Sequence, residues 1–174
     1  MSTVNSLTSS PLAPHEGISQ SVHELPHRVV AVCTSPGGVP KLPQAEVEIV
    51  LAGLIGDGRN HAKHIRPDRA VSLFDLEILT ELVREGFPLQ PGTAGENLTV
   101  QGLNVQSLPP GTILEIGQVV LRLETPRKPC YVLDAIDPRL KQAIVGRCGY
   151  MASVLRGGTI RPGMAIHRLI ANHS

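Results

Sequence analysis

Glycine and proline interrupt this chain so often that only short regular elements fit between them. The 174 residues include 17 Gly and 15 Pro. The intervening segments are rich in Val, Ile and Leu, and several alternate apolar and polar residues with the period of two that is typical of a half-buried strand. We predict strands at residues 29–34, 46–51, 70–74, 97–100, 113–116, 119–124, 149–156 and 164–170. Short strands joined by tight turns favour a mainly β fold closed into a barrel, because closure leaves no exposed strand edge.

Two segments show helical periodicity instead. The first runs from Asp75, a residue type that caps helix N-termini, to Gly86. The second runs from Asp137 to Gly146, and in both segments the apolar residues recur on one face. We expect two short helices that cover the barrel and contribute their apolar stripes to the core.

The length of the chain is sufficient to bury a self-sustaining core, and we predict a single domain over residues 29–174. Residues 1–28 lack a basic start followed by an apolar run, so we expect a flexible tail rather than a secretory signal. The three cysteines form no C-x-x-C pair, which argues against a disulfide framework or a structural zinc site. A reducing compartment, the cytoplasm, is therefore expected.

Composition also limits the partners. The formal net charge is +1, aromatic residues make up 2% of the chain, and no apolar run approaches the roughly 18 residues of a membrane span. Base-stacking platforms for single-stranded nucleic acid need more aromatic side chains than this. We expect no nucleic-acid and no membrane partner, and a small-molecule substrate or cofactor that is recognised locally.

Cys130 lies in an unusual setting, at the end of the segment Pro126-Arg127-Lys128-Pro129-Cys130. The two cations before it should stabilise a thiolate, which is the form that attacks sulfur or binds a soft metal. The prolines disfavour helix and cannot donate ladder hydrogen bonds, so we expect a stiff extended segment where a strand leaves its sheet. The alternative is a buried cysteine that acts as a small apolar residue.

A basic loop at residues 56–69 is too long and too polar for a simple connection. Its positive charge suits a phosphate or another anionic group. The candidate binding residues of the loop are Asp57, Arg59, His61, His64 and Arg69. Two alternatives remain open, a solvated basic loop or a metal site in which His61 and His64 act with Asp57 or Asp68.

A second polar cluster is formed by Gly95, Glu96 and Asn97. Gly95 permits close backbone approach, and Glu96 and Asn97 could hydrogen-bond the nitrogen-rich edge of a ligand. A plain turn before a strand is the alternative. Cys148 could resolve a disulfide or persulfide on Cys130, whereas Cys33 is expected to be a buried strand residue.

These pieces together resemble the MOSC domain family, which takes its name from the C-terminal domain of molybdenum-cofactor sulfurases. The resemblance excludes about the first 28 residues and covers most of the remaining chain. It is carried by Ser35-Pro36-Gly37-Gly38-Val39-Pro40-Lys41, Gly53-Leu54-Ile55-Gly56-Asp57, Pro67-Asp68-Arg69-Ala70-Val71, Gly95-Glu96-Asn97-Leu98-Thr99, Gly111 with Ile116-Gly117, and Pro129-Cys130. One departure is that His64-Ile65-Arg66 stands where related stand-alone members usually have His-Gly-Gly.

The resemblance implies a β-barrel in which Cys130 is the family's functional cysteine. In that family the cysteine either carries sulfur as a persulfide or ligates the molybdenum of a bound pterin cofactor. Stand-alone bacterial members include reductases of N-hydroxylated compounds. Applied to this chain, the loop from Arg59 to Arg69 would hold the cofactor phosphate. Arg127 would also bind the cofactor, and Glu96 and Asn97 would recognise the pterin.

Three functions follow as alternatives. The first is an oxidoreductase dependent on the molybdenum cofactor that reduces small N-hydroxylated molecules. The second is a sulfur carrier whose Cys130 accepts a persulfide from a pyridoxal-phosphate cysteine desulfurase, and the third is a non-catalytic anion-binding barrel. The chain has neither a Rossmann fingerprint nor a P-loop, so no nucleotide cofactor is expected and electrons would come from an external reductase.

Overall fold

The computed structural model describes residues 27–58 and 66–169. Nearly all of the predicted tail, residues 1–28, lies outside this part of the chain, as do Arg59, His61 and His64. Within it the fold is mainly β with two α-helices, and the prediction of a mainly β protein is confirmed. In the same residues, no helix is both long and apolar enough to cross a membrane.

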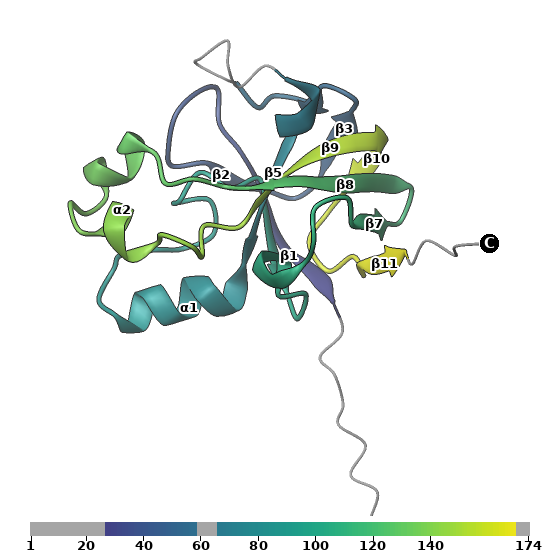
Figure 1. The fold of residues 1–174 in the computed structure, drawn as a ribbon. Helices are drawn as coiled ribbons and strands as arrows, with labels where there is room; N and C mark the ends of the chain where they lie inside the picture. The colour runs from purple at the N-terminus through teal and green to yellow at the C-terminus, as the bar shows by residue number, and fades with distance from the viewer. Residues whose placement is uncertain (1–26, 59–65, 170–174) are drawn as a thin grey trace, which may run out of the picture.

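Eight strands form the larger sheet, in the order β11-β7-β8-β9-β5-β6-β1-β2 (Figure 1). Their bounds are β1 Arg28–Thr34, β2 Leu42–Gln44, β5 Val71–Asp75, β6 Leu98–Gln101, β7 Ile113–Ile116, β8 Val119–Pro126, β9 Tyr150–Arg156 and β11 His167–Leu169. A smaller sheet has the order β10-β3-β4, with β10 Gly158–Ile160, β3 Val47–Val50 and β4 Gly53–Leu54. All neighbours pair antiparallel except β5 and β6, which are parallel.

Each of the eight predicted strands corresponds to one of these strands, with bounds that differ most in β11. The predicted strand at 164–170 shrinks to His167–Leu169, because residues 163–166 bond to β1 outside a regular ladder. Strands β2, β4 and β10 are two or three residues long, which is too short to show a period of two.

The prediction of a closed barrel is wrong, because the strand ladders of the larger sheet end at β11 and β2. Part of the gap is bridged where the chain before β11 meets β1. The amide of Val29 donates to the carbonyl of Met164 at 2.9 Å, and the amide of Ile166 donates to the carbonyl of His27 at 2.8 Å. The other half of β1 pairs with β2 through Val32, Cys33 and Thr34, so β2 remains a sheet edge.

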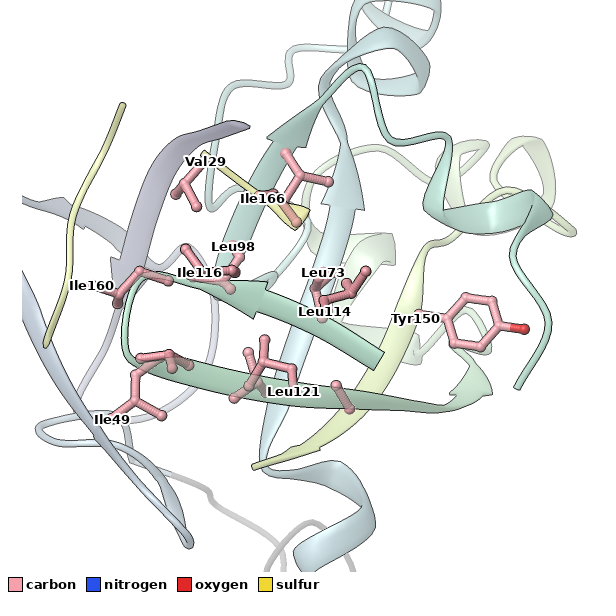
Figure 2. Packing of buried hydrophobic residues seen from close by; sticks show 14 of the residues in the cluster. Val29, Ile49, Leu73, Leu98, Leu114, Ile116, Leu121, Tyr150, Ile160 and Ile166 are labelled. Atoms are coloured by element: carbon pink, nitrogen blue, oxygen red, sulfur yellow. The ribbon is translucent and has the colours of Figure 1, made fainter. Parts of the chain in front are cut away.

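The main core lies between the strands, where side chains from both sheets point toward one another (Figure 2). Leu73, Leu98, Leu114 and Leu121 are fully buried and come from four different strands. Burying such a side chain contributes roughly 1.5–3 kcal/mol relative to leaving it in water, so the alternating pattern itself stabilises the sheet. Tyr150 is also buried, and its hydroxyl donates to the carbonyl of Leu108 at 2.9 Å.

A second core cluster forms under the helices α1 (Leu76–Arg84) and α2 (Leu140–Ala143). Figure 1 shows both helices on the same side of the fold, away from β7, β10 and β11. Three 3₁₀ turns complete the described elements, η2 Pro67–Arg69, η3 Val105–Ser107 and η4 Tyr131–Ala135. The two predicted helices are therefore present. Leu79, Leu82, Leu140 and Ile144 of their apolar faces are buried as expected, whereas Val83 is 44% exposed.

Asp75 precedes α1 but does not cap it with its side chain. Its carboxylate instead accepts hydrogen bonds from the amides of Val105 at 2.8 Å and Gln106 at 3.2 Å. Burial raises the pKa of Asp75, while these two amides oppose the rise. The residue thus ties the β5 end to η3, a long-range role that a local capping rule cannot reveal.

Candidate functional site

A cavity of about 470 Å³ opens where β8 ends and the beginnings of β5, β6 and β9 meet. Its wall includes Lys41, Asp57, Arg69, Ser72, Gly95, Asn97, Arg127, Lys128 and Cys130. Of the predicted site residues that the structure describes, Asp57, Arg69, Gly95, Asn97, Arg127 and Cys130 are brought together here. A volume of this size falls in the range of small-molecule pockets, roughly 300–1,000 Å³.

Cys130 is placed by the exit of the chain from β8. After β8 ends at Pro126, the amide of Arg127 still donates to the carbonyl of Gly149 at 2.8 Å. Cys130 itself is extended, with φ −112 and ψ 156, and its carbonyl accepts from the Leu133 amide at the start of η4. Its free thiol is partly exposed in the cavity wall, so it is accessible for chemistry.

The other two cysteines have different surroundings. Cys33 is fully buried, and burial, with the charge of Glu96 adding and that of Lys41 opposing, raises its pKa to about 12. Cys148 is 2% exposed, and burial raises its pKa, against the lowering effect of Arg127 and with smaller rises from Glu96 and Cys130. Both thiols therefore stay protonated at neutral pH.

Arg127 crosses from β8 toward two backbone segments. Its guanidinium donates to the carbonyl of Ala94 at 3.0 Å and to that of Cys148 at 3.4 Å. Gly95, with φ +81, lies so close to the opposite loop that a Cβ built on it would be 2.9 Å from Val39 Cγ1. A side chain at position 95 would therefore push this loop away from the cavity wall.

The cavity carries an excess of positive charge. Lys41 is paired with Asp57, whose side chain is 2% exposed. Among the described residues, no carboxylate lies within ion-pair distance of Arg69, Arg127 or Lys128. The Nε of Arg69 is buried and has no hydrogen-bond partner in this part of the chain. Such an orphaned donor beside uncompensated cations suits an anionic ligand.

Asn97 holds the cavity floor together. Its side-chain amide donates to the carbonyl of Cys33 at 3.2 Å and to Asp57 Oδ2 at 2.9 Å. Its oxygen accepts from the amide of Ser72 at 3.1 Å and from the Ser72 hydroxyl at 3.0 Å. Both donors and both lone pairs of the side chain are thus used within the protein. Asn97 positions Asp57, and its predicted contact with a pterin stays a prediction.

Glu96 lies behind this floor and is fully buried. One carboxylate oxygen accepts from the amide of Gly92 at 2.8 Å and from the Thr99 hydroxyl at 3.0 Å. The other oxygen is buried and has no partner among the described residues. The cavity wall does not include Glu96, so the structure places this predicted ligand contact one layer away.

The basic loop is only partly described. Arg59, His61 and His64 lie outside the described residues, whereas Asp57 and Arg69 flank that stretch at the cavity. In residues 27–58 and 66–169, no three His, Cys, Asp or Glu side chains are grouped to hold a metal ion. Arg66, one of the two residues that replace the family's glycines, is exposed and pairs with Asp68 at 3.0 Å.

The polar cavity residues that the sequence did not single out as ligand candidates are Lys41, Ser72, Thr125, Lys128 and Tyr131. Ser72 had a usable signal, since it is a polar residue inside the apolar strand β5. Lys41 ends a loop of glycines and prolines, and its approach to Asp57 depends on long-range packing. The only sequence signal for Lys128 was its position two residues before Cys130.

The family comparison and the curated relatives agree. A model of the MOSC domain matches residues 60–167. The uncharacterized protein YflK of Bacillus subtilis is 29% identical over 141 residues, 76% of this chain, and the protein YiiM of Escherichia coli is 31% identical over 137 residues, 72% of this chain. The matches span 63% and 60% of those two relatives, so this chain covers less than two thirds of either.

Solved structures share the fold. The crystal structure of YiiM from Geobacillus stearothermophilus superposes with a TM-score of 0.70 at 26% identity, covering 83% of this chain and 76% of that one. The YUAD protein of Bacillus subtilis gives a TM-score of 0.69 at 19% identity over 82% of this chain and 94% of that one, which supports the fold alone. With the MOSC model matching more than half of its residues, this chain belongs to the MOSC domain family.

Proposed function

We propose that the protein binds a molybdenum-pterin cofactor in the 470 Å³ cavity, with Cys130 as the protein ligand of the metal. The single observation that carries the proposal is the meeting of a free, accessible thiol with cations that have no carboxylate partner in the described residues. A thiolate suits a soft metal, and guanidinium groups suit a phosphate. Family membership supports the same chemistry.

The residues present fit such a group. The orphaned Nε of Arg69 and the amino group of Lys128 would pair with anionic oxygens, while Arg127 stays anchored on two carbonyls. The bound cofactor would supply two-electron redox chemistry at molybdenum. Asp57 is held by Lys41, Asn97 and the amide of Ser35, so the polar wall is organised before any ligand arrives.

The substrate class that we propose is a small N-hydroxylated molecule, reduced with electrons from an external reductase. The protein's own part would be to bind the molecule beside Cys130 and to fix its orientation against the polar wall.

The test is the metal and pterin content of protein purified from a host that makes the cofactor. We expect near-stoichiometric molybdenum and pterin in the wild type and a loss of molybdenum in Cys130→Ser. Cys148→Ser is the matched control, because it also removes one thiol but from a buried position. Absence of molybdenum from the wild type, or equal contents in wild type and Cys130→Ser, would overturn the proposal.

A second candidate is a sulfur carrier, favoured by the partial exposure of the free thiol of Cys130. Incubation with a pyridoxal-phosphate cysteine desulfurase and cysteine should then add one sulfur atom at Cys130, as detected by mass spectrometry. Cys130→Ser should gain none. An unmodified wild type after treatment with several desulfurases would refute this candidate.

A further inference from the structure

A second cavity of about 410 Å³ adjoins the first, and we call it the apolar cleft. Its apolar wall is made of Val39, Pro40, Pro88, Leu89, Ala135 and Ile136. The two polar lining residues are uncharged, so no titratable side chain lines the cleft. One of them, Thr93, already accepts a hydrogen bond from the amide of Gln90 at 3.2 Å.

The two cavities share walls. Val39 lines both of them, and the loop around it contributes Gly38 to the thiol-bearing cavity and Pro40 to the cleft. Two more segments do the same. Thr93 lines the cleft and residues 94–95 line the thiol-bearing cavity, while residues 130–132 line that cavity and residues 135–136 line the cleft. Val39 in turn packs closely against Gly95. Val39 therefore forms part of the divider between the two cavities.

The two cavities differ sharply in chemistry. The first carries a thiol and several cations, whereas no charged side chain lines the cleft, whose wall is aliphatic side chains and proline rings together with Gln90 and Thr93. A molecule that reaches from one into the other must have a polar end and an apolar end. Because no charged side chain lines the cleft, a charged group there would be buried without a partner, so an uncharged alkyl or aryl group suits it better.

We propose that the apolar cleft binds the alkyl or aryl part of the substrate whose N-hydroxylated group lies beside Cys130, and that Val39 limits the size of that part. The identity of the polar group rests on the proposed function, while the existence of the apolar subsite rests on the cleft itself. Each methylene that enters the cleft should tighten binding roughly fourfold, the fold-change expected from burying one methylene.

The test uses straight-chain alkanehydroxamic acids from acetohydroxamic to octanohydroxamic acid, titrated calorimetrically into the purified full chain. Wild type should bind longer chains more tightly until the cleft is full. Val39→Trp, which thickens the divider, and Ala135→Glu, which adds a charge at an exposed cleft position, should both abolish the dependence on chain length. In Ala135→Glu, which alters the cleft alone, binding of acetohydroxamic acid should change less than twofold.

Val145→Glu is the matched control, because Val145 is 58% exposed and lines neither cavity, and it should behave as wild type. Thermal unfolding of each variant checks that it is folded. A wild type without chain-length dependence, or a dependence kept in both variants, overturns the subsite. The molybdenum content of the same preparations tests the proposed function separately, because its absence would overturn that function without bearing on the chain-length dependence.

Discussion

At the level of single residues, the three cysteines show how one side-chain type acquires different properties from its position. Cys33 and Cys148 are buried and held as thiols, whereas Cys130 lies after β8 in the wall of the cavity and stays accessible. The sequence pattern marked Cys130 through its prolines and cations. It could not show that Glu96 lies near the other two thiols, since that proximity depends on packing.

Brief alkylation with iodoacetamide at pH 7.5 should therefore modify Cys130 alone in the folded protein. Peptide mass spectrometry should find Cys33 and Cys148 unmodified until the chain is unfolded in guanidinium, when all three react. If Cys130 stays unmodified in the folded protein, the non-catalytic barrel with a buried cysteine becomes the better description.

The buried Cys33 also predicts a dependence of stability on alkaline pH. Its pKa in the folded state is about 12, above the ordinary value of 9.0, so the folded state holds the thiol proton more tightly. The contribution of the Cys33 thiol to the free energy of unfolding is fully present below pH 9, and it is lost as the pH rises toward 12. Urea unfolding at pH 7–11 should show a shallower alkaline decline in Cys33→Ala than in wild type. Parallel declines would contradict this assignment.

At the level of elements, the site depends on a few side chains that join strands distant in sequence. Asn97 links the carbonyl of Cys33 in β1, the amide of Ser72 in β5 and the carboxylate of Asp57. Gly149 allows β9 to pass close to β5, since a Cβ there would lie 2.0 Å from the Leu73 carbonyl oxygen. These contacts set where the ends of the strands lie, and thus the form of the cavity.

Replacing Asn97 by Ala should lower the free energy of unfolding by about 2–4 kcal/mol, because it leaves several buried polar groups without partners. Chemical denaturation would measure the loss. Gln142→Ala is a suitable control, since Gln142 is an exposed residue of α2 and takes no part in this network. A stability change below about 0.5 kcal/mol would mean that Asn97 does not organise the cavity floor.

At the level of the whole molecule, the larger sheet is extended but not closed. The central pair β8 and β9 shares a long antiparallel ladder, whereas β2 and β11 are short edge strands that each pair on one side. Open edges leave backbone groups without sheet partners, so local opening should start there.

Hydrogen exchange should reveal this difference. Amides of Leu42, Gln44 and His167–Leu169 should exchange earlier than those of β8 and β9 when followed by mass spectrometry. Equal protection of edge and central strands would indicate a barrel that is closed in solution.

The sequence predicts the strands, the helices and the site of this protein to different extents. A period of two requires only local information, and it located the eight longer segments that became strands. Barrel closure depends on the register between residues far apart, and Asp75 joins η3 rather than capping α1, so both predictions failed for the same reason. Residues 59–65 lie outside the described part, and the role predicted for that loop stays a prediction.

Local chemistry in the chain was enough to predict a mainly β fold, two short helices and a suspect cysteine, and its ordered motifs resembled the family that the comparison then showed. Only the tertiary structure decided that Asp57, Arg69, Gly95, Arg127 and Cys130 meet at one cavity, and that an apolar cleft adjoins it across Val39. The physical reason is that residue type and periodicity act over a few neighbours, whereas cavities arise from packing between segments that the sequence leaves far apart.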